Sequence, residues 1–427
     1  MSTIRIGLAG LGTVGAEVAN QLINNKKELE TKAACNFNLI AVSARDKKLD
    51  RGVELDKIDW VDDASKLYLR DDIDLIVELI GGSDGIALKL CEGALNNEKS
   101  VVTANKAMMS KHGYNLSKLA EENSTTIAYE ASVAGCIPII KSLREGMSGT
   151  KVNSVSGILN GTCNYILSTM RETGRSFDDV LNEAQEKGYA ETDPTFDIDG
   201  IDAAQKLIIL SSIAFGIVPN NKNITINGIR EVDVTDIAFA EELGYRIKLL
   251  AFSKYNDRGL IQEVSPCMIS KKQQMSSIEG VLNAVQIDSD LAGSVMLTGY
   301  GAGAKPTASA VLSDIISVAL KSSIPIFGRE AKDLLKSVSI GEADNHRYYI
   351  RVNVIDKSGV LANVTEIFRK HKLSIESLLQ RGRNPNEEVP VVITTHEISE
   401  TTLKAVMSEL STSKELLGKP VSMKIIS

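Results

Sequence analysis

The sequence predicts an α/β protein built from three domains, and three observations carry this prediction. The chain has 427 residues, more than one hydrophobic core usually organises. Its first third alternates apolar, strand-like runs with helical segments, a pattern typical of a parallel sheet with helices on both faces. Its last part repeats a strand and helix pattern of small-domain size. We expect a doubly wound parallel sheet in 1–130, a mixed α+β domain in 131–330 and an α+β unit in 347–427.

Five apolar runs predict the strands of the first sheet, and two stretches with helical periodicity predict helices beside them. The strands are expected at 4–9, 39–43, 75–79, 100–103 and 126–129, and the helices at 16–29 and 87–96.

A glycine-rich loop follows the first predicted strand and opens the first predicted helix. It consists of Gly10, Leu11, Gly12, Thr13, Val14 and Gly15. The first glycine permits a tight turn, the second lets backbone approach a pyrophosphate, and the third lets helix pack on strand. The helix N-terminus adds N–H donors and a positive dipole. In this context the motif favours a Rossmann-type dinucleotide-binding domain over a plain glycine turn.

The end of the second strand bears on the choice of cofactor. An acidic residue there would hydrogen-bond the ribose hydroxyls of NAD, but this sequence has Arg45, followed by Asp46. Arg45 favours NADP, whose 2′-phosphate an arginine accommodates. An exposed surface arginine with NAD as the cofactor is the alternative.

The middle of the chain does not continue the regular alternation of strands and helices. Strands are predicted at 152–159 and 263–268, and helices at 176–187 and 201–215. The segment 305–330 is expected to contain a helix over 308–320 that packs back on the first domain. A polar stretch at 341–347 is the predicted linker to the last unit.

Two segments carry candidate catalytic groups. Thr103 and Lys106 follow the fourth predicted strand, at the carboxyl edge of the sheet where ligands of such folds bind. The segment 188–206 places five carboxylates in a loop with glycine and proline and then begins a helix. Asp202 and Lys206 are four residues apart and share a helix face. An exposed ion pair is the alternative interpretation.

Six segments together resemble the homoserine dehydrogenase family, in that family's order. They are GLGTVG at 10–15, TANK at 103–106, EASVAGCIPII at 130–140, GILNGTCNYIL at 157–167, GYAETDPTFDIDGIDAAQK at 188–206 and TGYGAGAKPTASAVLSDI at 298–315. The resemblance covers nearly all of the chain up to residue 330. It implies an oxidoreductase that transfers hydride reversibly between NADP or NAD and L-aspartate 4-semialdehyde, giving L-homoserine for threonine, methionine and isoleucine biosynthesis. It also implies a homodimer or homotetramer.

The resemblance implies roles for individual residues. Lys206 matches the family's acid/base lysine, and Lys106 matches the lysine at the junction of cofactor and substrate. Glu191 and Asp202 match the carboxylates that hold the substrate. An ammonium near the aldehyde would stabilise the developing alkoxide and could deliver the proton. Two lysines converging on one pocket would repel, which predicts a lowered pKa for at least one of them.

Two further loops match the family. The resemblance implies a monovalent cation, sodium or potassium, held by one carboxylate and by backbone carbonyls at Glu130, Val133, Gly135 and Ile137. Oxygen ligands of low total charge suit such an ion better than zinc. From the residues alone this segment would be a plain strand-to-helix turn. The glycine loop with Gly301 and Gly303 corresponds to the one that the family uses beside the nicotinamide.

The C-terminal unit predicts a βαββαβ order. Strands are expected at 348–355, 374–380, 389–396 and 421–426, and helices at 360–371 and 400–410. The loop with Asp356, Gly359 and Asn363 resembles the ligand loop of ACT domains, which implies feedback sensing of an amino acid, with threonine the natural effector. A purely structural dimerising unit is the alternative. The polar segment 381–388 departs from the family pattern.

Composition and two rival functions complete the prediction. A net charge of −7 provides no basic excess for nucleic acid. Five scattered cysteines, without a secretory leader or an apolar run of membrane-spanning length, predict a cytoplasmic protein without a membrane partner. A phosphorylating semialdehyde dehydrogenase would need Cys163 or Cys136 as a thiolate, but neither has a histidine beside it in sequence, which favours inert thiols. A non-catalytic amino-acid or redox sensor would not need the acidic segment with its lysine.

Overall fold

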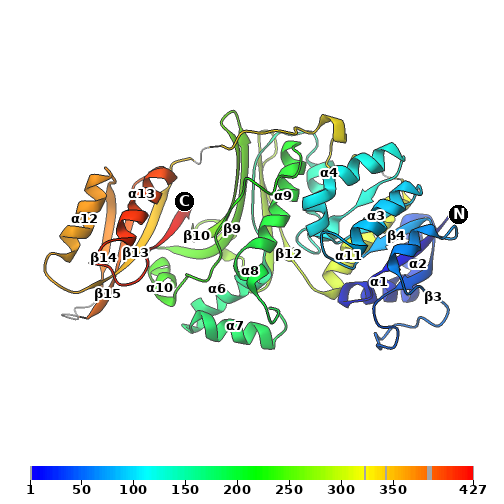
Figure 1. The fold of residues 1–427 in the computed structure, drawn as a ribbon, viewed down its shortest axis with the longest axis horizontal. Coiled ribbons are helices and arrows are strands. Elements are labelled where there is room, and N and C mark those ends of the chain that lie inside the picture. Colours follow the sequence, from blue (N-terminus) through cyan, green and yellow to red (C-terminus); the bar gives the residue numbers. More distant parts are fainter. Residues whose placement is uncertain (1, 322–323, 342–343, 382–386, 427) are drawn as a thin grey trace.

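The computed structural model describes residues 2–321, 324–341, 344–381 and 387–426. The molecule is elongated, with the N-terminal sheet at one end and the C-terminal unit at the other (Figure 1).

The first sheet is parallel throughout and has the strand order β3-β2-β1-β4-β5-β6. Its strands are β1 Thr3–Ala9, β2 Asn36–Ser43, β3 Asp59–Trp60, β4 Leu75–Glu78, β5 Ser100–Thr103 and β6 Ile127–Ala128. Its helices are α1 Thr13–Asn24, α2 Lys26–Ala33, α3 Ile86–Asn96 and α4 Lys106–Glu122. The chain order reverses between β1 and β4, and this reversal opens a crevice at the carboxyl ends of the strands.

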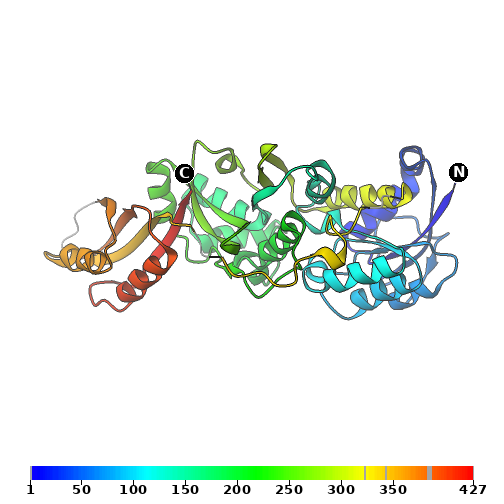
Figure 2. The ribbon, with the colours of Figure 1, turned by 90° about the horizontal axis from the view of Figure 1, so that it is seen from above.

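Helices cover both faces of this sheet, as predicted. The apolar side chains of α1 and α2 share one core with β1 and β2, and those of α3 and α4 share another with β4 and β5. A later helix, α11 Ala304–Ala319, returns to the first of these faces and packs against α1 (Figure 2).

One predicted helix of the first domain is wrong. The single helix expected at 16–29 is two helices, because Asn25 leaves the helical region at φ −112° and ψ 21° and serves as the boundary of both. The break redirects the chain so that Leu29 and Ala33 of α2 are buried in the core with β2.

The second sheet has the order β12-β11-β7-β9-β10-β16-β13-β15-β14, with β8 also paired to β10. Its strands from the middle of the chain are β7 Val152–Ile158, β8 Thr225–Ile226, β9 Tyr245–Asn256, β10 Gly259–Ser270, β11 Leu282–Ser289 and β12 Gly293–Tyr300. The helices of this part are α5 Ile139–Lys141, α6 Gly161–Thr173, α7 Phe177–Glu186, α8 Thr195–Ile198, α9 Ile201–Phe215 and α10 Val234–Glu242. Helices α6, α9 and α10 pack against β9.

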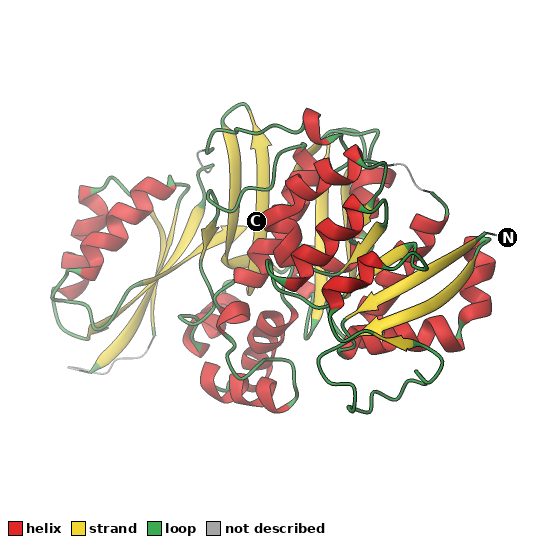
Figure 3. Ribbon diagram, turned by 45° about the vertical axis from the view of Figure 1, so that its right-hand side comes forward, coloured by secondary structure: helices red, strands yellow, loops and turns green. Residues whose placement is uncertain are grey.

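The C-terminal unit has the predicted βαββαβ order. It consists of β13 Arg347–Ile355, α12 Val360–Lys370, β14 Ile375–Gln380, β15 Glu388–Thr395, α13 Glu400–Ser411 and β16 Val421–Ile426. Its sheet is continuous with the middle sheet, because β16 pairs in parallel with β10 from Cys267 to Ile269 (Figure 3). Across the described residues, no helix combines the length and the apolarity needed to cross a membrane.

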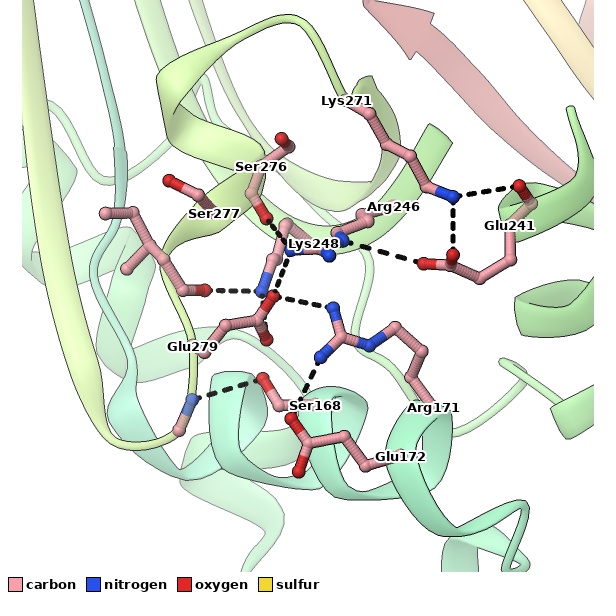
Figure 4. A network of polar contacts seen from close by, with 12 residues as sticks. Ser168, Arg171, Glu172, Glu241, Arg246, Lys248, Lys271, Ser276, Ser277 and Glu279 are labelled. Atoms are coloured by element: carbon pink, nitrogen blue, oxygen red, sulfur yellow. Dashed lines mark hydrogen bonds and ion pairs between the residues drawn. The ribbon is translucent and has the colours of Figure 1, made fainter. Parts of the chain in front are cut away.

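A buried polar network fixes α6 on the middle sheet (Figure 4). Lys248 of β9 donates to Asn164 of α6 at 3.0 Å and pairs with Glu279 at 3.2 Å, and Glu279 also pairs with Arg171 of α6 at 2.6 Å. Burial lowers the pKa of Lys248 to about 8. This network matters for the site because α6 begins directly after Asn160.

Candidate active site

The glycine loop has the geometry of a phosphate-binding turn. Gly10 adopts φ +96°, and a Cβ there would lie 2.4 Å from the carbonyl oxygen of Leu79. A Cβ on Gly15 would lie 1.8 Å from the carbonyl oxygen of Gly10, so helix and strand approach too closely for a side chain. A Cβ on Gly12 would meet no atom within 4 Å, and no side chain caps the N-terminus of α1. The start of α1 is therefore open to an anion.

Basic side chains lie beside this loop. Arg45 follows the end of β2, where the sequence placed it, and its side chain is exposed. Arg51 was missed: its Nε donates to the carbonyl oxygen of Leu11 at 3.0 Å, and its guanidinium lies 5.6 Å from the ring centroid of Trp60. Lys47 lies over the same ring at 6.0 Å. Arg51 is separated from the strand by an irregular loop, so no spacing rule pointed to it.

A cavity of about 650 Å³ lies between the first sheet and the middle domain. It brings together segments that are far apart in the chain: the start of α1, the TANK segment, the loop after Glu130, the acidic segment and the second glycine loop. The predicted residues that line it are Val14, Lys106, Gly135, Glu191, Asp202, Lys206, Gly301 and Gly303.

Asp202 joins the two predicted catalytic lysines. It lies in the first turn of α9, with its side chain 4% exposed. Its Oδ2 accepts a hydrogen bond from Lys206 Nζ at 2.8 Å, and its Oδ1 forms an ion pair with Lys106 Nζ. The predicted shared face of Asp202 and Lys206 is confirmed. The alternative of an exposed ion pair is wrong, because both side chains are buried.

Burial and neighbouring charges both shift the pKa values of Asp202 and Lys206. Burial alone would raise the pKa of Asp202, but Lys206 and Lys106 outweigh it, and the pKa is lowered. The pKa of Lys206 is also lowered, and burial is the largest cause, while Asp202 opposes it and Lys106 adds to it. The expected direction is therefore confirmed for Lys206, but desolvation contributes more than repulsion between the lysines.

Asn160 is a residue that the sequence analysis quoted in a motif without assigning it a function. It caps α6 by accepting from Cys163 N at 2.8 Å, and its Nδ2 donates to Asp202 at 2.9 Å and to Asp197 at 2.8 Å. Burial and the charge of Asp202 raise the pKa of Asp197. The order Asn-Gly-Thr before a helix is a helix N-cap signature, and it could have identified Asn160.

The backbone of Leu159 also positions Lys206. Its carbonyl oxygen accepts from Lys206 Nζ at 2.7 Å and from Asn283 Nδ2 at 3.0 Å. Asn283 packs so closely against Gly301 that a Cβ at Gly301 would lie 2.1 Å from it. Because Gly301 has no side chain, the second glycine loop can pass close to Asn283, which binds the Leu159 carbonyl that orients Lys206.

Two predicted residues occupy other places in the site. Thr103 is fully buried behind the cavity wall, where its hydroxyl donates to Glu78 at 2.6 Å and accepts from Asn105 N at 3.0 Å. Glu191 is exposed at the cavity rim, where its backbone carbonyl accepts from Gln185.

Comparison with known proteins supplies the family. The profile described as homoserine dehydrogenase matches residues 138–316, and the profile of the homoserine dehydrogenase NAD binding domain matches residues 10–130. The homoserine dehydrogenase of Neisseria gonorrhoeae is 38% identical over 99% of this chain and 98% of that protein. This chain belongs to the homoserine dehydrogenase family. It is therefore an oxidoreductase with an NAD binding domain, and the resemblance noted from the motifs is confirmed.

Solved structures agree with this assignment. The homoserine dehydrogenase from Thiobacillus denitrificans is 36% identical, covers 100% of this chain and 99% of its own, and superimposes with a TM-score of 0.92. A hyperthermophilic archaeal homoserine dehydrogenase in complex with NADPH is 29% identical, covers 75% of this chain and 98% of its own, and has a TM-score of 0.64. The ACT domain profile matches residues 348–412, which confirms the C-terminal ACT domain.

The loop at which a monovalent cation was predicted is largely buried. Glu130, Val133 and Ile137 are buried in one turn, and Gly135 of the same turn lines the cavity. The carboxylate of Glu130 accepts from Ile140 N at 2.7 Å and from Lys141 N at 2.8 Å. Burial and the nearby Asp314 raise the pKa of Glu130 to about 7. Asp314 was not among the residues predicted for this site. Its carboxylate accepts a hydrogen bond from Glu130 N at 2.7 Å.

The predicted effector residues lie between the end of β13 and the first turn of α12. Gly359 adopts φ +91° and caps α12, Asp356 follows β13, and Asn363 donates to Glu415 at 2.9 Å. Of the divergent segment, 382–386 lie outside the described residues.

Cys163, one of the two thiols considered for the rival thioester chemistry, is poorly placed to act as a nucleophile. Cys163 is fully buried beneath Asn160, its Sγ donates to the carbonyl oxygen of Asp197 at 3.2 Å, and burial raises the pKa of its thiol. A buried thiol with a raised pKa is a poor nucleophile.

Proposed function

We propose that the chain interconverts L-aspartate 4-semialdehyde and L-homoserine by hydride transfer with a nicotinamide cofactor. The observation that carries the proposal is the ion pair of buried Asp202 with buried Lys206 and with partly exposed Lys106. It lies on one cavity with the start of α1 and the second glycine loop, so a bound dinucleotide and a small aldehyde would meet there.

Lys206 is proposed as the acid in aldehyde reduction. Two of its three N–H groups are held by Leu159 O and Asp202, which leaves the third to face the cavity. The ammonium would stabilise the alkoxide that develops on the aldehyde oxygen and transfer a proton to it. Lys106 is the alternative proton donor, since it also faces the cavity and is more exposed.

Asp202 and Glu191 are proposed to hold the substrate. Asp202 pairs with both lysines, holds them in place and can accept from the substrate hydroxyl. Glu191 stands at the rim with its side chain exposed, where it could accept from the substrate's α-ammonium. Its loss should raise KM more than it lowers kcat.

The cofactor is proposed to be NADP. The open N-terminus of α1 fits the pyrophosphate, and Arg45 with Arg51 provides positive charge for a 2′-phosphate. The NADPH complex of the archaeal relative agrees with this preference. When bound, the cofactor supplies or accepts the hydride at C4 of its nicotinamide.

A monovalent cation, sodium, is proposed at Glu130 and at the backbone carbonyls of Val133, Gly135 and Ile137. Two buried carboxylates, Glu130 and Asp314, lie at this turn. Lys141 pairs with Asp314 at 3.2 Å, so the two carboxylates and this lysine leave one negative charge that a cation of low charge would balance. Such an ion would hold the turn that faces the cavity.

The ACT domain is proposed to sense an amino acid, threonine, through the loop with Asp356, Gly359 and Asn363. ACT ligands bind at shared interfaces, so this role also implies a homodimer or homotetramer. Five cysteines without a disulfide suit a reducing cytoplasm.

The test is NADPH oxidation with L-aspartate 4-semialdehyde, repeated with NADH, with and without L-threonine. We expect oxidation, faster with NADPH, and a loss of that preference in the Arg45→Ala, Arg51→Ala double variant. No oxidation with either cofactor would overturn the proposed reaction.

A further inference from the structure

Phe196 lies beside one of the two proposed lysines of the active site. It belongs to α8, the short helix that precedes Asp202. The Nζ atom of Lys106 lies over the Phe196 ring, 5.4 Å from its centroid. An ammonium within about 6 Å of a ring centroid is attracted by the negative face of the ring. No function was assigned to Phe196 from the sequence.

The hydrophobic core does not explain the position of this ring. Phe196 is 39% exposed, and the hydrophobic clusters among the described residues do not include it. The core contact of α8 comes instead from Ile198, which is fully buried. A single exposed apolar side chain is common on protein surfaces and indicates no function by itself. What distinguishes Phe196 is the charged group that its ring faces.

Hydrogen bonds fix the helix that carries the ring. The carboxylate of Asp197, the residue after Phe196, accepts from Asn160 Nδ2 at 2.8 Å. The carbonyl oxygen of Ile198 accepts from Ile229 N at 2.8 Å. The backbone on the C-terminal side of Phe196 is therefore held to two other segments of the middle domain, and the ring is presented at a defined place.

The first domain fixes the backbone of Lys106. Lys106 is the first residue of α4, and Asn105 caps that helix by accepting from Met108 N at 3.0 Å. Asn105 Nδ2 also donates to the carbonyl oxygen of Gly82 at 2.7 Å. The lysine side chain is flexible beyond this point, and holding its ammonium in one place costs rotamer entropy. Contacts at the tip of the side chain must offset that cost.

Two contacts hold the tip of the Lys106 side chain, and both come from the middle domain. Asp202 Oδ1 forms an ion pair with the ammonium, and Phe196 provides the ring face. Asp202 also binds Lys206 through Oδ2, so the ring is the contact that Lys106 does not share with the second lysine. The ion pair and the ring occupy two sides of the ammonium, and Lys106 lines the cavity with the rest.

We propose that Phe196 is a positioning residue, whose ring face holds the Lys106 ammonium against Asp202 across the cleft between the first and middle domains. Lys106 is 32% exposed, so without the ring its ammonium would turn toward solvent more often. The kinetic consequence rests on the proposed function, whereas the contact itself does not depend on the reaction.

The sharpest test changes the charge distribution of the ring and keeps its shape. Phenylalanine that carries one, two or three fluorine atoms is incorporated at position 196, because fluorine withdraws negative charge from the ring face that attracts a cation. We expect kcat/KM for reduction of L-aspartate 4-semialdehyde to fall stepwise along this series, by at least about threefold with three fluorine atoms. A series with constant kcat/KM would overturn the proposal.

Phe177 of α7 is the control for the fluorinated residues. It is not among the described residues that line the cavity. The same fluorinated residues at position 177 should therefore leave kcat/KM unchanged. An equal fall at both positions would contradict a specific role of Phe196.

Two natural substitutions separate the ring face from apolar volume. Phe196→Leu keeps an apolar side chain but removes the ring, so kcat/KM should fall at least about threefold while the melting temperature of the protein stays unchanged. Phe196→Tyr keeps a ring face and should retain kcat/KM within about twofold of wild type. Wild-type kcat/KM in Phe196→Leu, or an equal loss in Phe196→Tyr, would contradict the role of the ring.

Lysine labelling tests the contact without the reaction. The cofactor-free protein is acetylated with an amine reagent, and the extent at each lysine is measured by mass spectrometry. Lys106 should react at least about twofold faster in Phe196→Leu than in the wild type, because the ring no longer covers it. Lys111 lies on the same helix and pairs with Asp84, so its rate should not change.

The labelling distinguishes failure of this inference from failure of the proposed function. An unchanged labelling rate of Lys106 in Phe196→Leu would show that the ring does not hold the ammonium. A wild type that oxidises no NADPH, together with faster labelling of Lys106 in Phe196→Leu, would refute the proposed reaction and leave the contact standing.

Discussion

Replacing Asp202 by asparagine tests the electrostatics of the candidate site most sharply. Unit charges 2.8 Å apart, the distance from Asp202 Oδ2 to Lys206 Nζ, attract by about 6 kcal/mol at an effective dielectric constant of about 20. Observed shifts from one neighbouring opposite charge are about 1–3 pKa units. Asparagine keeps the shape and removes the charge, so only the weaker attraction of Asp197 would oppose the effect of burial and Lys106 on the pKa of Lys206. We therefore expect the pKa of Lys206 to fall further in this variant.

The consequence is a shift in the pH profile of kcat/KM for reduction of L-aspartate 4-semialdehyde. A lysine acid must be protonated, so the rate falls as pH rises through its pKa, and in Asp202→Asn this fall should move toward acid. Asp193→Asn is the control, because it makes the same change on an exposed carboxylate of the same acidic segment, 188–206. An alkaline limb that stays in place in Asp202→Asn would refute Lys206 as the acid held by Asp202.

Three other changes have defined outcomes. Asn160→Ala removes the cap of α6 and the hydrogen bonds from Asn160 to the carboxylates of Asp197 and Asp202. The free energy of unfolding, measured with urea, should fall by about 1–2 kcal/mol, and kcat should also fall. An unchanged kcat would mean that Asn160 does not position Asp202. Sodium should raise the melting temperature of the wild type relative to choline at equal ionic strength but leave Glu130→Gln unaffected, and an equal rise in both would exclude Glu130 as a ligand. Lys248 has a pKa of about 8 in the fold against 10.5 in the unfolded chain, so the folded state binds fewer protons between these values and its stability rises with pH. The wild type should gain up to about 3 kcal/mol relative to Lys248→Met across this window in denaturant titrations, and a constant difference would contradict the buried ammonium.

The sequence predicted those parts of the fold that depend on local patterns. The strands of the first sheet, the glycine loop and the βαββαβ order follow from alternation and turn chemistry, and the structure has all of them. The continuous sheet could not be predicted in this way. Pairing between β10 and β16 joins residues 267–269 to 424–426, and no local pattern encodes a contact at that separation.

The site shows the same division. The resemblance placed Lys106, Asp202 and Lys206 in one pocket, and the structure brings them together. The groups that orient them were missed because their function depends on the fold: the carbonyl of Leu159 has no signature in sequence, and Asn283 meets it from another strand.

The central claim is that Lys206, held by Asp202, transfers the proton when the aldehyde is reduced. Its most direct test is single-turnover oxidation of NADPH by L-aspartate 4-semialdehyde in the wild type, in Lys206→Ala and in the exposed-lysine control Lys111→Ala. We expect Lys206→Ala to lose at least about a hundredfold in rate while Lys111→Ala keeps the wild-type rate. A Lys206→Ala rate within a few-fold of wild type would contradict the claim and transfer the acid's role to Lys106.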